Sequence, residues 1–173
     1  MTSHVYVFLL LFVSVWLEVF FGSYGILVPL VGVAVYYVSV TYDWDIGLLA
    51  GICCGAIIDS VYGRGVYFSS LLFAAVVPLA MFWLCFVETR SVAMLAIPGA
   101  CIGGICSGVL AGASLLLCGF SWDVFFQSGA ALLFAMGAGA LLLPSSVLVL
   151  DALAEDLGFE LFAKAKDKLP QRR

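Results

Sequence analysis

The chain has 173 residues, of which 65% are hydrophobic and only 10% are charged, and its mean hydropathy is +1.21. A soluble domain carries about 25% charged residues because its surface faces water, so this composition excludes an ordinary soluble fold. The net charge of −4 and the lack of a basic patch give no sign of nucleic-acid binding.

Long apolar runs dominate the chain. A helix needs about 20 apolar residues to cross a bilayer, because lipid offers no hydrogen-bond partner to its backbone. We therefore predict an all-α integral membrane protein, a compact bundle of about six transmembrane helices. The predicted spans are residues 5–21, 26–41, 46–62, 66–87, 91–118 and 124–150.

The first span follows no Lys or Arg and precedes no small-residue cleavage site, so we expect it to be retained rather than removed as a signal peptide. Four prolines are expected to kink spans rather than to end them, because neighbouring helices can satisfy the freed backbone groups. They are Pro29, Pro78, Pro98 and Pro144.

The charged residues divide the chain in two. More than half of them fall in residues 151–173, so we predict a transmembrane bundle over 1–150 and a charged C-terminal tail over 151–173. The tail has a leucine stripe at i+4 spacing, which indicates an amphipathic helix. Its lysines and arginines place it in the cytoplasm. With six spans the N-terminus is cytoplasmic too, whereas five spans would place it outside.

Small residues recur at every fourth position of the third span. Such residues share one helix face and let another helix approach closely. This face serves either packing within the chain or the binding of a partner helix. We take it as the candidate partner-binding face, made of Gly47, Gly51, Gly55, Asp59 and Gly63. The fifth span carries a second small-residue surface that includes Gly99, Gly103 and Gly112.

Two carboxylates lie within predicted spans. A charge at the bilayer centre costs about 2.5–3.5 kcal/mol on insertion scales, so each should face protein or water. Asp59, near the end of the third span, either caps the following turn, where Arg64 could approach it, or belongs to a binding surface; a proton relay is a further reading. Glu18 is either a solvated interfacial residue or a functional one.

The sequence argues against an enzyme. Its one histidine, His4, lies before the first span, so no serine–histidine pair can form inside the membrane. No cluster of His, Cys and carboxylates has the spacing of a metal site, and no phosphate-binding loop is present. We expect no catalytic residues, no metal and no cofactor.

The pattern of the second and third spans resembles the rod shape-determining protein MreD family. A proline opens the second span, aromatic residues follow, and G-x-x-x-G-x-x-x-D-x-x-x-G ends the third span. The positions that carry the resemblance are Pro29, Tyr36, Tyr37, Gly51, Gly55, Asp59 and Gly63.

This resemblance implies a non-catalytic scaffold of the bacterial cell-wall elongation complex, in the inner membrane. Its partners would be an MreC-like protein, the MreB cytoskeleton, and the elongation glycosyltransferase and transpeptidase, with self-association left open. The family is similar in fold to the S components of energy-coupling-factor vitamin transporters, which supplies the alternative function. The scarcity of polar residues for a vitamin pocket favours the scaffold.

Overall fold

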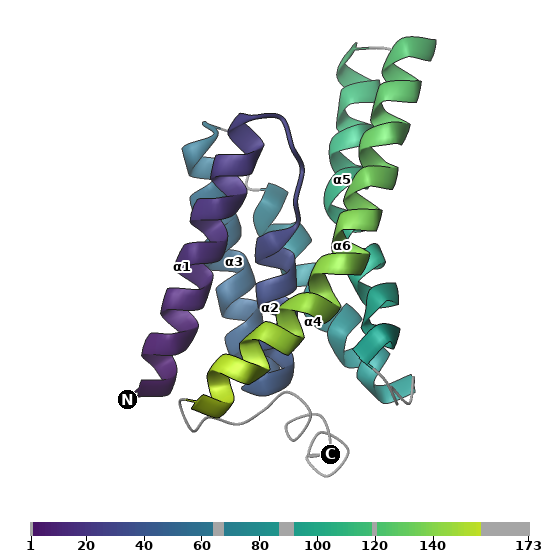
Figure 1. Ribbon diagram of the computed structural model, residues 1–173. Helices are drawn as coiled ribbons and strands as arrows, with labels where there is room; N and C mark the ends of the chain where they lie inside the picture. Colours follow the sequence, from purple (N-terminus) through teal and green to yellow (C-terminus); the bar gives the residue numbers. More distant parts are fainter. Residues whose placement is uncertain (1, 64–67, 87–91, 119–120, 157–173) are drawn as a thin grey trace.

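The computed structural model describes residues 2–63, 68–86, 92–118 and 121–156, and within these ranges every regular element is helical. Helix α1 begins and α6 ends at the same end of the bundle (Figure 1). The elements in chain order are α1 (Thr2–Ser23), α2 (Leu30–Thr41), α3 (Trp44–Val61), α4 (Phe68–Phe86), the 3₁₀ turn η1 (Val92–Leu95), α5 (Ala96–Cys118) and α6 (Trp122–Asp156).

Four stretches of the described helices are long and apolar enough to cross a membrane, namely Val5–Ser23, Trp44–Val61, Phe68–Cys85 and Trp122–Leu153. Each overlaps a predicted span. The apolar stretch Leu30–Thr41 is shorter, as is the stretch Ala93–Val109, which covers parts of η1 and α5. The described chain is therefore an all-helical protein with candidate membrane spans, and the count of six stays a prediction.

Helix α2 is shorter than its predicted span of 26–41. Its 12 residues cover about 18 Å at 1.5 Å per residue, less than the roughly 30 Å of a hydrocarbon core. Residues 26–29 have no regular structure, and Pro29 stands at the N-cap. The reason is steric: a proline disfavours helical geometry in the residue before it. Pro29 therefore starts the helix instead of kinking it.

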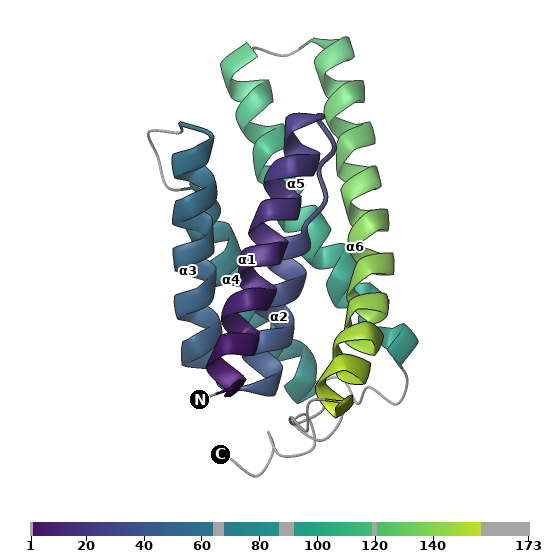
Figure 2. The same cartoon turned by 60° about the vertical axis from the view of Figure 1, so that its left-hand side comes forward.

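Helix α2 is the centre of the bundle, with the other helices around it (Figure 2). All of its residues from Val31 to Thr41 are buried, and Tyr36 and Tyr37 have no exposed surface. Its sequence carries no charge, and a helix that is apolar on every side is typically buried on every side. The core of the protein is thus built outward from this helix.

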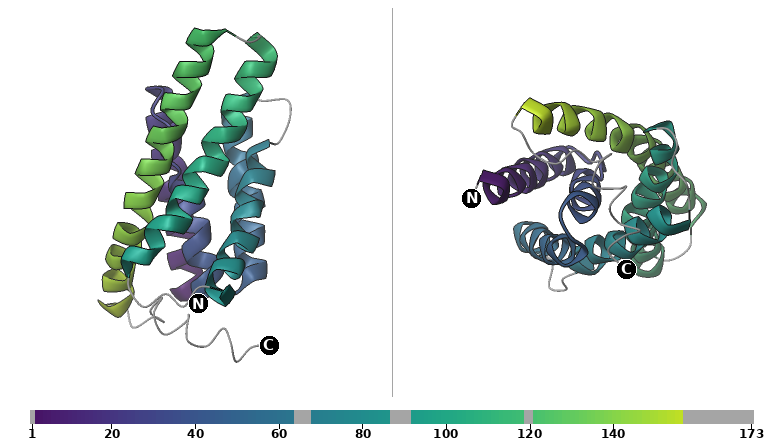
Figure 3. Two further views of the ribbon diagram at one scale, coloured as in Figure 1. Left: turned by 90° about the vertical axis from the view of Figure 1, so that its right-hand side faces the viewer. Right: turned by 90° about the horizontal axis from the view of Figure 1, so that it is seen from below.

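Helices α5 and α6 form a closely packed hairpin that extends beyond the ends of α1 and α3 (Figures 1 and 3). Glycines allow the close contact: a Cβ atom on Gly99 would overlap the carbonyl oxygen of Gly139, and one on Gly103 would overlap that of Ala135. Gly112, farther along α5, has no neighbour within 4 Å of such an atom. Part of the second small-residue surface therefore packs within the chain.

The C-terminal tail is described only in part. Residues 151–156 continue α6 without a break, so the boundary predicted at 150 falls inside this helix. The rest of the predicted tail, residues 157–173, lies outside the described residues, as does Arg64.

Candidate functional site

Asp59 holds the first turn of α4 against the last turn of α3. Its side chain has no exposed surface. The backbone N–H of Ser69 donates to Oδ2 at 2.7 Å, and the Ser69 hydroxyl donates to Oδ1 at 2.7 Å. Two donors on two oxygens satisfy a buried carboxylate, and a negative charge is favourable at a helix N-terminus. Asp59 therefore caps α4 across the intervening turn.

Glu18 makes a similar contact one helix pair earlier. The backbone N–H of Val31 donates to its Oε2 at 2.7 Å. Pro29, the N-cap residue of α2, makes no side-chain capping bond of its own. The half-buried carboxylate of α1 thus supplies the cap that α2 lacks. Glu18 is a bundle residue that faces α2, rather than a solvated residue of the interface.

The two carboxylate caps follow one plan. Each carboxylate stands four residues before a glycine, Gly22 or Gly63, and each bonds the second residue of the helix that follows. The turns after these helices contain glycines with positive φ, 76° at Gly25 and 62° at Gly63. Such values suit glycine, which has no Cβ atom to clash. In both helix pairs, α1–α2 and α3–α4, a carboxylate of the first helix therefore caps the second helix.

Three glycines of the candidate partner-binding face of α3 are covered from within the chain. A Cβ atom on Gly47 would overlap Ser39 of α2, one on Gly51 would lie 3.0 Å from the Phe73 backbone, and one on Gly55 would overlap the Ser70 backbone. Gly63 stands in the turn after α3. Gly47, Gly51 and Gly55 therefore serve helix packing within the chain. The binding of a partner by this face stays a prediction.

A polar cluster that sequence reasoning missed joins α1, α2 and α6 near the end of the bundle where α1 begins. The Tyr37 hydroxyl donates to Oδ1 of Asp151 at 3.2 Å, and the Tyr6 hydroxyl donates to the Leu150 carbonyl at 3.4 Å. The side chains of Tyr6 and Tyr37 also interact with each other. The sequence signal was weak, because tyrosines near span ends usually read as membrane anchors.

The contacts of these carboxylates join neighbouring helices. Glu18, Asp59 and Asp151 each bond groups of a neighbouring helix. No group of three or more His, Cys, Asp or Glu side chains in the described part of the chain could hold a metal ion. What the carboxylates do here is fix where helices begin and how they pack.

Comparisons with known proteins give no relative. No family model matches the chain, no curated protein matches its sequence, and no solved structure matches its fold.

We expect Glu18→Ala to loosen the start of α2. The substitution removes the acceptor of the Val31 N–H, and loss of a capping bond costs about 1 kcal/mol. Amide hydrogen exchange in detergent should show faster exchange at residues 30–33 and little change in α5. Leu9→Ala, which shortens an exposed side chain of the same helix, is the control. Equal protection of α2 in both variants would contradict the cap.

Proposed function

We propose that this chain is a non-catalytic scaffold of the bacterial cell-wall elongation complex, similar to MreD, in the inner membrane with both termini in the cytoplasm. It would bind an MreC-like protein and, with it, connect the MreB cytoskeleton to the elongation glycosyltransferase and transpeptidase. The resemblance of residues 26–80 in sequence pattern supports this proposal. So does the position of the start of α1 and the end of α6 at one end of the bundle (Figure 1).

The observation that carries the proposal is an exposed aromatic cluster at the far end of the α5–α6 hairpin. This aromatic tip consists of Trp122, Phe125 and Phe126, with exposed fractions of 67%, 46% and 67%. Their rings pack on one another with centroids 6.0–6.2 Å apart. Exposed apolar patches of this kind mark contacts with proteins or membranes.

The length of α6 favours a protein contact at the aromatic tip. Its 35 residues extend for about 52 Å, well beyond the roughly 30 Å of a hydrocarbon core. If α1, with its 22 residues, crosses the membrane, the tip lies beyond the hydrocarbon. Contact with another protein would cover these aromatic side chains beyond the hydrocarbon.

The filled centre of the bundle favours a scaffold over a vitamin-binding S component. Fully buried apolar side chains from four helices meet there, among them Val35, Val76, Ile102 and Leu143. A pocket for a soluble vitamin needs several converging polar groups. Packed aliphatic side chains at the centre suit a rigid body that presents its outer surface to partners.

The test is affinity purification in mild detergent from the native membrane, followed by mass spectrometry. We expect an MreC-like protein and the elongation enzymes to be recovered. Phe126→Ser should reduce their recovery about tenfold, as expected for loss of an interface anchor, whereas Leu148→Ser, at an exposed position elsewhere on α6, should not. Recovery of a coupling subunit with paired ATPases would instead identify a transporter S component.

A further inference from the structure

Helix α1 is the least embedded helix of the bundle. Among its residues 5–23, only Val7 and Ser14 are buried. Helices in lipid are held together by close packing and by polar contacts, and α3 with α4, like α5 with α6, approach each other at their backbones through glycines. The one glycine of α1, Gly22, meets only the end of a side chain, the hydroxyl of Tyr62. Close packing therefore contributes less to the position of α1 than to that of the other helices.

A groove separates α1 from α6, and α2 forms its floor. Its volume is about 290 Å³, and residues such as Val13 of α1, Ala34 of α2 and Val149 of α6 line it. The three helices can be followed in Figure 2. The hydroxyls of Ser14 and Ser145, which also line the groove, each donate to a carbonyl of their own helix. The serines in the walls of the groove therefore do not tie α1 to α6.

Polar contacts hold α1 near each of its two ends. Near the turn that leads to α2, the Val31 N–H donates to Oε2 of Glu18 at 2.7 Å. Near the beginning of α1, the Tyr6 hydroxyl donates to the Leu150 carbonyl of α6 at 3.4 Å, and the Tyr6 side chain also interacts with Tyr37 of α2. The groove lies between these two sets of contacts.

The two ends of α1 are held unequally. A bond between a hydroxyl and an oxygen is typically about 2.5–3.0 Å long, so the 3.4 Å bond of Tyr6 is weak, whereas the 2.7 Å bond of Glu18 is short. The turn of residues 24–29 also ties the Glu18 end to α2 through the chain itself. Lipid is as apolar as the side chains between helices and can replace the apolar contacts of α1. The beginning of α1 is therefore the end that can move away from α6.

We propose that α1 is a hinged helix, which pivots at Glu18 and opens the groove toward the bilayer, with the Tyr6 hydroxyl as the latch that holds it beside α6. In the open state the beginning of α1 lies away from α6, and the face of α2 around Ala34, buried in the closed state, contacts lipid. A minor state of this kind is typically populated at about 0.1–10%. This inference does not rest on the scaffold function, since it concerns the contacts of α1 alone.

The test measures two distances between α1 and α6 by double electron–electron resonance, in the full chain reconstituted into lipid nanodiscs. Spin labels are attached through a ketone-bearing amino acid, so the native cysteines stay in place. One pair of labels replaces Leu9 and Leu148, and the other replaces Phe20 and Leu141, all of which are exposed. We expect the first pair to show a major short distance with a minor longer one, and the second pair, near the pivot, to show a single distance.

Variants separate the latch from the pivot. Tyr6→Phe keeps the ring and removes the hydroxyl, and it should raise the ratio of open to closed molecules in the first pair about threefold, as loss of a weak hydrogen bond does. The second pair should not change. Tyr24→Phe, at an exposed tyrosine just after α1, is the matched control and should leave both pairs unchanged. Glu18→Ala weakens the pivot, so it should broaden the distances of the second pair.

Two outcomes would overturn the proposal. One is the same distribution of distances between positions 9 and 148 in the unsubstituted chain and in Tyr6→Phe, which would mean that the Tyr6 hydroxyl does not hold α1 closed. The other is an equal change of both pairs in Tyr6→Phe. In that case α1 would separate from the bundle as a whole, and Glu18 would not be a pivot.

Discussion

Gly55→Ala should strongly destabilise the protein. A methyl group at this position would overlap the backbone of Ser70, the neighbouring residue on α4. Backbone atoms cannot move aside as the end of a side chain can, so α3 and α4 must separate. Overpacking of this kind costs about 1–3 kcal/mol, and we expect the upper end of that range. Thermal unfolding in detergent, followed by tryptophan fluorescence, measures the loss.

Gly137→Ala is the matched control for this substitution. Gly137 is also within a helix, and no atom lies within 4 Å of a Cβ atom built there. Its replacement should leave stability within about 1 kcal/mol, the size of the helix-propensity difference between glycine and alanine. Equal loss in the two variants would mean that close contact between α3 and α4 does not decide the stability of the fold.

The positions of the long helices could be predicted from sequence because hydropathy alone specifies them. The predicted spans at 5–21, 46–62, 66–87 and 124–150 overlap the four candidate membrane helices. Hydropathy did not reveal that α2 starts only at Leu30, because residues 26–29 are as apolar as the helix they precede. Pro29 indicated this later start, because a proline disfavours helical geometry in the residue before it.

The sequence predicted which residues of the candidate site share one face of α3. It did not predict which neighbouring helices contact that face. The i+4 spacing of Gly47, Gly51 and Gly55 fixes which residues share a face, whereas only the fold shows that α2 and α4 cover it. Periodicity within one helix contains no information about its neighbour. The cap by Glu18 was missed for the same reason, since its acceptor role depends on α2 beginning beside it.

A signal for that cap was nevertheless present in the chain. Glu18 precedes Gly22 by four residues, as Asp59 precedes Gly63, and in both cases another helix follows within a few residues of the turn. Comparison of the two helix pairs would have assigned both carboxylates the same role.

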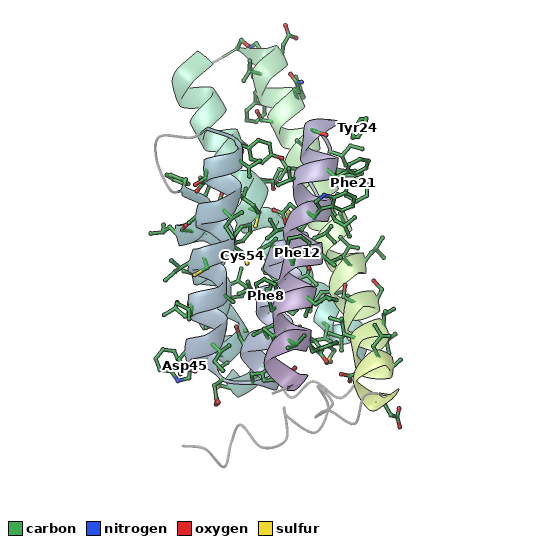
Figure 4. The ribbon with its side chains drawn as sticks, turned by 90° about the vertical axis from the view of Figure 1, so that its left-hand side faces the viewer. Phe8, Phe12, Phe21, Tyr24, Asp45 and Cys54 are labelled. Carbon is green, nitrogen blue, oxygen red and sulfur yellow. The ribbon has the colours of Figure 1, made fainter. Side chains whose placement is uncertain are left out.

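Figure 4 shows how different the outer side of α1 is: Phe8 and Phe12 lie there, with exposed fractions of 71% and 63%. That face carries no such polar contact.

Asp59→Ala should be the most damaging single substitution of a polar residue. It removes the acceptor of both the Ser69 N–H and the Ser69 hydroxyl, in a place with no exposed surface. A buried donor left without a partner costs about 1–3 kcal/mol, so two of them cost about 4 kcal/mol. Asp59→Asn keeps the shape and one acceptor oxygen, and its loss should be about half as large.

Asp45→Ala is the control for the buried carboxylate. Asp45 lies exposed at the opposite end of α3 (Figure 4), where its Oδ1 accepts only the N–H of the next residue, Ile46, at 2.8 Å. Water can replace that acceptor, so its loss should barely change the unfolding temperature. Amide exchange at residues 68–71 gives a second readout, which should rise in Asp59→Ala alone. If both alanine variants unfold at one temperature and protect residues 68–71 equally, Asp59 does not anchor α4, and a role in partner binding becomes the better account of this carboxylate.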